Sequence, residues 1–313
     1  MLCIASAITA VACVGSRGPL AAGDNAAHAT LPQWKGASPN GSNAFRFVVM
    51  GDNTGGARPG AWEEAIAEIN LLKPDFVLSV GDLIEGYTTN RAELSVMLTG
   101  LDAMTTRLHA PFYHCPGNHD ITNPMMYDTW VARYGVKGKS YYSFDYRNSH
   151  FVVLDTATPF FNTNMVAEEV QWLGRDLAAS RQADHVFVFY HVPQWANADV
   201  WPQVAKLLDP AKTTIFNGHL HRLSYGAPDG IPTYVLAATG AEYPGSDDRV
   251  HRATGSETGE FPMFAHVVVD GGKPSVAIIP LHGVLPGDYL RQDMQGQSRD
   301  SRKQAPVQQR PDR

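Results

Sequence analysis

The sequence of 313 residues is poor in cysteine, with only Cys3, Cys13 and Cys115. Three thiols cannot build a disulfide scaffold, so the apolar core has to stabilise the fold. Positive charge is also sparse: the net charge is −6 and no basic cluster precedes the extreme C-terminus, which argues against binding to a nucleic-acid polymer. No uninterrupted apolar run is long enough to span a bilayer. The patterns G-x-S-x-G and G-x-x-x-x-G-K-[ST] are missing too, which argues against a serine hydrolase and a P-loop protein.

The N-terminal segment combines small and apolar residues without charge. Its first sixteen residues, MLCIASAITAVACVGS, are too few for a membrane span but fit the apolar core of a secretory signal. No Lys or Arg precedes this run, so either the true start lies upstream or the signal is atypical; the alternative is a disordered N-terminus. Ala10-Val11-Ala12-Cys13 resembles the lipobox of bacterial lipoproteins, in which Cys13 would carry the lipid. We therefore expect residues 1–43 to be a signal-like segment and linker, and the protein to be exported: periplasmic, extracellular or lipid-anchored.

The rest of the chain divides into one long domain and a tail. Across residues 44–285, apolar runs typical of strands alternate with helical patterns, which predicts an α/β fold of two packed sheets with helices outside. The run FYHCPGNHD at 112–120 is predicted to be a strand followed by a long exit loop. Residues 286–313 are rich in Gln, Arg, Asp and Pro without periodicity, which predicts a disordered tail.

Side chains of metal-binding types follow five of the predicted strands. Beyond the carboxyl ends of strands in α/β sheets, loops converge and hold such side chains rigidly. Each of these residues alone is explained by turn chemistry or by a core histidine, but five strand ends in one chain point to a shared metal site. The residues are Asp52, Asp82, Asn118 with His119, His191, and His219 with His221.

The last of these stretches is FNGHLH, residues 216–221. In an extended chain residues i and i+2 point to the same face, so the imidazoles of His219 and His221 would converge on one object. Gly218 allows a close backbone approach. For this pattern alone, a surface loop with two solvated histidines is the alternative.

In chain order, the motifs resemble those of the calcineurin-like metallophosphoesterases: GD at 51–52 and 81–82, GNHD at 117–120, His191, and GHLH at 218–221. The resemblance covers roughly residues 45–285 and implies a four-layer α/β/β/α sandwich, with two mixed β-sheets flanked by helices. It also implies two divalent metal ions with Asp82 as their bridge. The implied ligands are Asn118, His191 and His219 at the second metal, and Asp52 and His221 at the first. A nitrogen and oxygen shell without thiolate suits Mn, Fe or Zn.

The resemblance implies a metal-dependent phosphohydrolase that cleaves a phosphomonoester or phosphodiester of a small molecule. A metal-bound hydroxide would attack phosphorus, and His119 would protonate the leaving group as a general acid. Glu85 stands three residues past Asp82, where the serine/threonine phosphatase branch has an acidic residue that orients the catalytic histidine; an exposed loop glutamate is the alternative. Purple acid phosphatases carry a tyrosine ligand at that spacing, and Tyr87 comes two positions too late for it.

The chain departs from the family pattern at the first metal. The usual motif is Asp-x-His, but here it is Asp52-Asn53-Thr54, and a neutral hydroxyl is a poor ligand compared with imidazole. Three outcomes are open: a weaker first site completed by water, substitution by another side chain, or a single-metal or inactive protein. We favour the weaker site because every other ligand remains. The rival interpretation is a phosphate-binding pseudoenzyme with a degraded first metal site.

Three further residues near the motifs have two interpretations each. Arg58 follows the glycine-rich turn TGGARPG and could contact a phosphate oxygen, or it is a solvated loop residue. Trp195 and Trp201 follow His191 and could stack on the leaving group, or they anchor their loop to the core.

Overall fold

The structure is a computed structural model that describes residues 43–158, 167–241 and 261–281. The predicted segment 1–43, apart from its last residue, and the predicted tail 286–313 lie outside the described residues. So does Cys13, the predicted lipid anchor. Among the helices in the described ranges, none is both long and apolar enough to cross a membrane.

The first sheet contains the strands at the two ends of the described chain. Its strand order is β11-β10-β1-β2-β3. Strands β1, β2 and β3 run parallel, while β10 is antiparallel to β1 and to β11, so the sheet is mixed. The bounds are β1 Phe45–Met50, β2 Phe76–Ser79, β3 Phe112–Tyr113, β10 Met263–Asp270 and β11 Lys273–Pro280.

The second sheet is formed by the middle of the chain, in the order β4-β5-β6-β7-β9-β8. Strands β5, β6, β7 and β9 run parallel, and the outer strands β4 and β8 are antiparallel to their neighbours. The bounds are β4 Tyr142–Tyr146, β5 Ser149–Val153, β6 His185–Phe189, β7 Thr213–Asn217, β8 Ser224–Gly226 and β9 Thr233–Val235.

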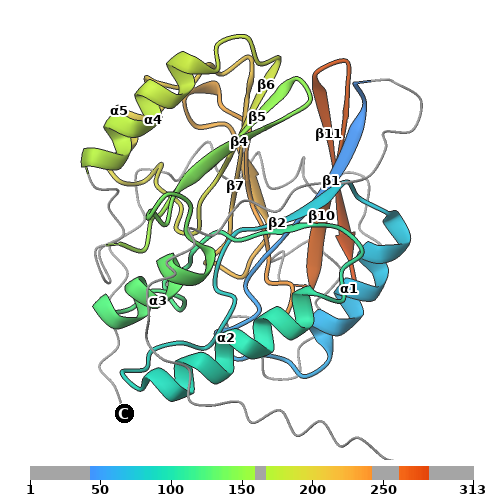
Figure 1. The fold of residues 1–313 in the computed structure, drawn as a ribbon. Helices are drawn as coiled ribbons and strands as arrows, with labels where there is room; N and C mark the ends of the chain where they lie inside the picture. The colour runs from blue at the N-terminus through green and yellow to red at the C-terminus, as the bar shows by residue number, and fades with distance from the viewer. Residues whose placement is uncertain (1–42, 159–166, 242–260, 282–313) are drawn as a thin grey trace, which may run out of the picture.

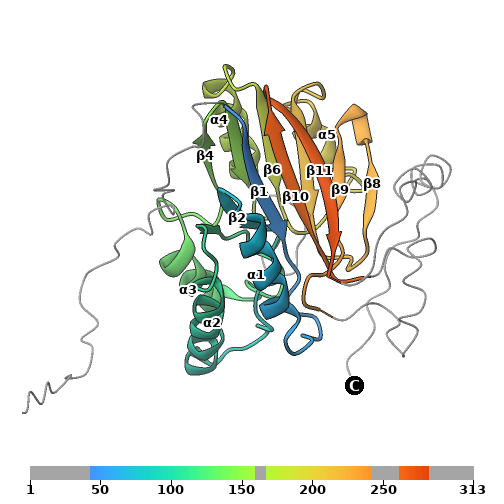
Figure 2. The same cartoon turned by 90° about the vertical axis from the view of Figure 1, so that its right-hand side faces the viewer.

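Helices cover the outer face of each sheet (Figures 1 and 2). Apolar residues of α1, α2 and α3 pack on the first sheet, and those of α4 and α5 pack on the second. The four-layer α/β/β/α sandwich with two mixed sheets is therefore confirmed. The bounds are α1 Ala61–Leu72, α2 Arg91–Thr105, α3 Pro124–Tyr134, α4 Ala167–Ala179 and α5 Trp201–Ala205, and a 3-10 turn covers Pro228–Gly230.

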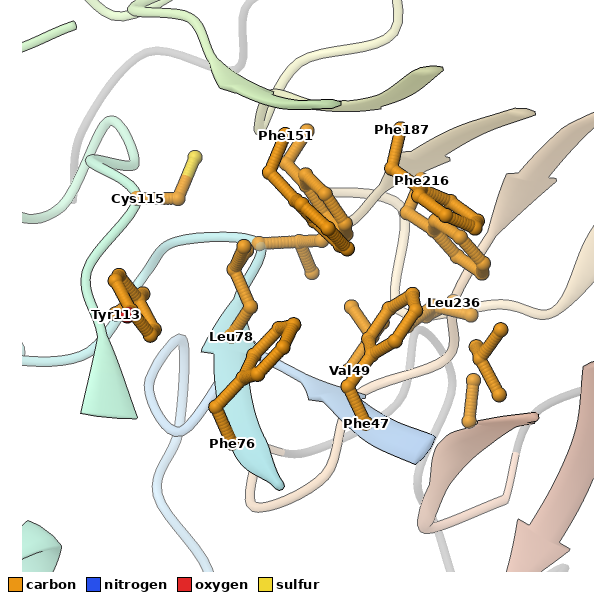
Figure 3. Packing of buried hydrophobic residues seen from close by; sticks show 14 of the residues in the cluster. Phe47, Val49, Phe76, Leu78, Tyr113, Cys115, Phe151, Phe187, Phe216 and Leu236 are labelled. Carbon is orange, nitrogen blue, oxygen red and sulfur yellow. The ribbon is translucent and has the colours of Figure 1, made fainter. Parts of the chain in front are cut away.

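The main core lies between the two sheets and is rich in phenylalanine (Figure 3). Phe47 of β1 stacks on Phe76 of β2 with ring centroids 5.3 Å apart, and both rings meet Phe151 of the second sheet edge-on. Alternate residues of β1 point the other way, so Val48 and Met50 pack under the helices. This alternation follows from the period of two in a strand. Both faces of β1 are thus buried, which explains its continuous apolar run.

Two helices were not predicted, α3 and the short α5. Helix α3 begins at Pro124, inside the segment expected to be a loop after the GNHD motif. Asn123 caps it by accepting a hydrogen bond from the main-chain nitrogen of Met126, and Pro124 occupies the first helical turn. Both features are standard helix-start signals. The helix closes over the first sheet through Met126 and Trp130, which are buried.

Candidate metal centre

The predicted ligands follow parallel strands of both sheets at their carboxyl ends. Asp52 comes just after β1 and Asp82 just after β2, while His191 follows β6 and His219 follows β7. Because the two sheets pack face to face, the loops after these strands meet at one end of the sandwich. A main-chain hydrogen bond joins the loops after β1 and β2: the nitrogen of Asp52 donates to the carbonyl of Gly81 at 2.9 Å.

Two groups of side chains could each hold a cation. The donor atoms of Asp82, His191 and His219 lie within 4.8 Å of one another, and so do those of Asp52, Asp82 and His221. Asp82 is common to both groups. The structure therefore brings together five of the six residues predicted as ligands, in the same two groups and with the same shared carboxylate.

The sixth predicted ligand, Asn118, borders the second group. Its Oδ1 atom lies 3.0 Å from Nε2 of His191. The same Nε2 is 3.0 Å from Oδ2 of Asp82 and 3.2 Å from Nδ1 of His219. Three candidate donor atoms thus lie within 3.2 Å of a fourth, Nε2 of His191, close enough together to share one cation.

Hydrogen bonds and burial set the protonation of these imidazoles. His191 is fully buried, and its Nδ1 lies 2.8 Å from the carbonyl oxygen of Val80, so Nδ1 carries a proton and Nε2 faces Asp82. Burial disfavours the charged imidazole, but Asp82 raises the pKa of His191 to about 9, so a cation at this position has to displace a proton from Nε2. Burial opposes ionisation of Asp82, yet His191 lowers the pKa of this carboxyl to about 2. Burial lowers the pKa of His219 to about 4. At neutral pH Asp82 is therefore an anion and His219 a neutral nitrogen donor, both suited to bind a cation.

The group of Asp52, Asp82 and His221, at the first cation position, contains a buried carboxylate oxygen whose negative charge is uncompensated within the described part of the chain. Asp52 is fully buried, and its Oδ2 atom has no hydrogen-bond partner among the described residues. Its Oδ1 accepts a hydrogen bond from the main-chain nitrogen of His219 at 2.8 Å and lies 3.5 Å from Nε2 of His221. A buried carboxylate oxygen without a donor is costly unless a positive charge compensates it. The donor set therefore fits a divalent ion such as Mn, Fe or Zn.

Four of the candidate ligands have left-handed backbone conformations. Their φ values are 49° at Asp52, 53° at Asp82, 74° at His219 and 50° at His221. For residues other than glycine this region costs about 1 kcal/mol or more each, and such strain concentrates at functional sites. The chain holds four strained residues within one small volume, which is the pattern of a binding site.

The backbone of residues 218–221 differs from the one predicted from the sequence. The segment 218–221 was expected to be extended, so that alternate side chains share a face. Instead β7 ends at Asn217, the nitrogen of Leu220 donates to the carbonyl of Gly218 at 2.9 Å, and His219 and His221 are left-handed. The two imidazoles reach adjacent groups because of a tight turn and not because of strand periodicity.

Two glycines allow the loops to approach the carboxylates. A Cβ atom at Gly117 would overlap the carboxylate of Asp82, and one at Gly218 would overlap that of Asp52. These two positions belong to the GNHD and GHLH motifs. Any larger residue there would displace a carboxylate that the candidate centre needs.

His119, the predicted general acid, is held at the edge of the centre. Its main-chain nitrogen donates to Oδ1 of Asp82 at 2.8 Å, and its Nδ1 lies 3.0 Å from the main-chain carbonyl oxygen of Glu85. The carboxylate of Glu85 instead accepts a hydrogen bond from the nitrogen of Ala57 at 3.2 Å. The expectation that the Glu85 side chain orients His119 is therefore corrected: the main chain of Glu85 does so, and its carboxylate supports the neighbouring loop.

Thr54 occupies the position where the family motif has histidine. It is buried, and its hydroxyl makes no hydrogen bond of ordinary geometry within the described part of the chain. Burial of Glu85 works against ionisation, but the nearby Thr54 hydroxyl, the Ala57 nitrogen and His119 together lower the pKa of this carboxyl. Glu85 does not belong to either of the two groups of candidate ligands.

Two residues of the site were missed by sequence reasoning. Asp120 is buried, and its carboxylate accepts hydrogen bonds from the main-chain nitrogens of Leu83, Ile84 and Gly117 at 2.8 to 3.1 Å. It thereby ties the loop after β2 to the loop after β3. Its presence in the GNHD motif was the available signal. The other is Tyr87, which was considered only as a metal ligand and lies two positions too late for that; its phenol oxygen accepts a hydrogen bond from Nδ2 of Asn118 at 2.9 Å.

The three candidates for substrate contact all contact other parts of the protein. The guanidinium of Arg58 donates to the main-chain carbonyls of Ala241 at 3.0 Å and Thr239 at 3.4 Å. Trp195 and Trp201 both pack into the apolar cluster under α4 and α5. These contacts agree with the interpretation that the tryptophans anchor their loop to the core.

A four-layer sandwich that gathers carboxylates and imidazoles at its strand ends is the architecture of a metallophosphoesterase. The family comparison agrees: the Calcineurin-like phosphoesterase family model matches residues 45–223, more than half of the chain. This protein belongs to that family.

The individual relatives have low sequence identity to this chain. The serine/threonine-protein phosphatase CPPED1 of Danio rerio is 27% identical over 203 residues, which are 58% of this chain and 65% of the relative, just under two thirds of its length. A dimetal phosphatase structure from Danio rerio is similar with a TM-score of 0.57 at 16% identity, over 76% of this chain and 96% of that one. GAP50, described as the anchor in the inner membrane complex of Plasmodium, has a TM-score of 0.56 at 14% identity, over 76% and 85% of the chains. At these identities the two structures establish the fold alone.

Proposed function

We propose that this protein is a phosphohydrolase that binds two divalent cations and cleaves a phosphomonoester or phosphodiester of a small molecule. One observation carries the proposal: Asp82 is common to two groups of donor atoms, each within 4.8 Å. A single shared carboxylate is what a two-metal site needs to hold its cations close together. The orphaned Oδ2 of buried Asp52 supports the first of the two positions.

Each residue has a definite task in this proposal. Asp52 and His221 hold the first cation with Asp82, while His191, His219 and Asn118 hold the second with it. When bound, such a pair of cations polarises the phosphoryl group and lowers the pKa of a coordinated water. Because Nδ1 of His191 donates to the Val80 carbonyl, Nε2 is the atom directed at the second cation, which would take the place of its proton.

His119 supplies the proton for the leaving group. Its Nδ1 is held by the Glu85 carbonyl, so Nε2 is the atom from which a proton can be transferred. Its main-chain nitrogen donates to Asp82, the carboxylate that both groups of candidate ligands share, which supports a place for His119 beside them. The ring is only partly buried, so a leaving-group oxygen can approach it. Proton transfer of this kind contributes about 10² to 10⁴ in rate.

The test combines metal content with turnover. Purified protein is stripped with a chelator, titrated with Mn²⁺ by calorimetry, and assayed with p-nitrophenyl phosphate and bis(p-nitrophenyl) phosphate. We expect about two equivalents of bound Mn²⁺ and metal-dependent hydrolysis of at least one of the two substrates. Asp82→Asn is expected to weaken both binding events, since Asp82 serves both groups.

A second candidate function rests on Thr54. The absence of an imidazole at this position favours a phosphate-ligand binding protein with a degraded first site. This alternative predicts one equivalent of Mn²⁺ or none, binding of inorganic phosphate, and no turnover of either ester. That result would overturn the hydrolase proposal.

A further inference from the structure

Tyr87 contacts two residues of the candidate centre at once. Its phenol oxygen accepts a hydrogen bond from Nδ2 of Asn118 at 2.9 Å. Its ring meets the imidazole of His119 edge-on, with centroids 4.5 Å apart and an interplanar angle of 82°. One side chain therefore adjoins a candidate ligand of the second cation and the candidate proton donor.

The backbone is distorted to bring Tyr87 there. Gly86 and Tyr87 both have positive φ, 59° and 47°, and a Cβ atom at position 86 would overlap the carbonyl of His119. A left-handed conformation costs a tyrosine about 1 kcal/mol or more. Core packing does not explain this cost, because half of the Tyr87 side chain is exposed. Among the described residues, five of the nine non-glycine residues with positive φ lie at the candidate centre, Tyr87 among them, and such strain clusters at functional sites.

The hydrogen bond to Tyr87 decides which end of the Asn118 amide faces the centre. Only the amide oxygen can bind a cation, because the NH₂ group is a donor with no acceptor capacity. With Nδ2 on the phenol oxygen, Oδ1 lies on the His191 side, 3.0 Å from Nε2. Without the phenol oxygen, the NH₂ group of Asn118 loses its partner, so the orientation that presents Oδ1 to the cation is less strongly favoured over the reversed one.

We propose that Tyr87 is a positioning residue that orients the Asn118 amide toward the second cation and holds the His119 imidazole beside the leaving group. This inference rests on the proposed function. The two contacts are separable by mutation, because the hydrogen bond involves only the phenol oxygen and the ring contact does not need it.

Two variants and one control test the proposal. Tyr87→Phe removes the oxygen and keeps the ring, while Tyr87→Leu removes both. Tyr146→Phe is the matched control: its phenol donates to Asp75 at 3.0 Å and is also partly buried, but Asp75 precedes β2 and so lies at the opposite end of the strand from the centre. Each protein is titrated with Mn²⁺ and assayed with p-nitrophenyl phosphate and phenyl phosphate, whose leaving group is poorer.

Tyr87→Phe is expected to weaken Mn²⁺ at the second position about tenfold, as loss of a hydrogen bond to a metal ligand does. Tyr87→Leu is expected to lower kcat further, by about tenfold more on phenyl phosphate than on p-nitrophenyl phosphate, because a poor leaving group depends on the general acid. Tyr146→Phe should match the wild type in both measurements.

Wild-type Mn²⁺ affinity and kcat in Tyr87→Phe would overturn the proposal even if Tyr87→Leu failed to fold. A wild-type protein that binds no Mn²⁺ would instead overturn the proposed function, and that result needs no variant.

Discussion

The Nδ1 atom of His119 lies 3.0 Å from the main-chain carbonyl oxygen of Glu85. The imidazole is therefore oriented by the backbone, which no side-chain substitution at position 85 removes. We predict that Glu85→Gln changes kcat by a factor of about five or less, because it removes only an interaction with a largely exposed charge, worth up to about 1 kcal/mol. The glutamine oxygen can still accept the hydrogen bond from Ala57. Steady-state kinetics with p-nitrophenyl phosphate provide the measurement.

The comparison for this variant is His119→Ala, which removes the group that transfers the proton. We expect its kcat to fall by about 10² to 10⁴. If Glu85→Gln proved as damaging as His119→Ala, the carboxylate and not the carbonyl would be the orienting group, and the corrected role of Glu85 would be wrong.

Gly55 is predicted to be essential for the first cation position. A Cβ atom there would lie 2.8 Å from Cε1 and 3.3 Å from Nε2 of His221, so Gly55→Ala is expected to displace this imidazole from its present position. We expect Mn²⁺ affinity at the first position to fall about tenfold or more, as displaced ligand shells do. Calorimetric titration separates this loss from binding at the second position.

Gly60 offers a matched control for that substitution. Its φ of 85° is nearly the same as the 88° of Gly55, but a Cβ atom there would have no neighbour within 4 Å. Both alanine variants should therefore lose a similar stability of about 1 kcal/mol from backbone strain, and only Gly55→Ala should lose metal. Equal Mn²⁺ binding by the two variants would show that the loop at Gly55 does not border the first position.

The layers of the fold were predictable because each of their signals is local. Every buried strand is a short apolar run, and the run in β1 is continuous because both of its faces are covered. The start of α3 was also marked locally, since Asn123 and Pro124 form a cap and first turn, but an Asn-Pro pair is equally typical of a turn and therefore fits the loop that was expected there.

The candidate site was predictable in composition but not in its supporting contacts. The ligand types and their order along the chain pointed to two groups that share Asp82, as the structure has them. The contact of His119 with the Glu85 carbonyl and that of Asn118 with Tyr87 join segments more than 30 residues apart. No periodicity records such pairs, because they depend on how the loops after β2 and β3 pack.

Thr54 can be tested by restoring the residue that the family pattern expects. We predict that Thr54→His raises Mn²⁺ affinity at the first position, because imidazole is a far better ligand than a hydroxyl. Thr54→Val is the control, since it has nearly the same shape and adds no donor, and it should bind Mn²⁺ as the wild type does. If Thr54→His left both metal affinity and activity unchanged, the assignment of Asp52 and His221 to a first cation would be in doubt.

His150 forms a charged network away from the centre. Its Nδ1 lies 2.7 Å from Asp145 and its Nε2 2.9 Å from Asp176, which links the β4–β5 hairpin to α4. Ser143 donates to the other oxygen of Asp176 at 2.7 Å. We predict that His150→Gln, which is neutral at every pH, lowers the free energy of unfolding by about 1 to 3 kcal/mol at pH 6. Urea unfolding in the presence of a chelator measures this difference without a contribution from bound metal.

The same difference should depend on pH, and its sign follows from the pKa of His150. Burial lowers this pKa, but the two carboxylates raise it more, so the net shift is upward. A group whose pKa is higher in the folded state stabilises the protein fully below its unfolded pKa of about 6.5 and loses that effect as the pH rises through the folded value. The difference in the free energy of unfolding between wild type and His150→Gln should therefore shrink from pH 6 to pH 9.

His185→Gln is the control, because burial lowers the pKa of His185 to about 4 and this histidine stays neutral in the folded state from pH 7 to 9. The difference in unfolding free energy between wild type and His185→Gln should therefore stay constant from pH 7 to 9. If the difference between wild type and His150→Gln also stayed constant from pH 6 to 9, His150 would not be a charged partner of Asp145 and Asp176.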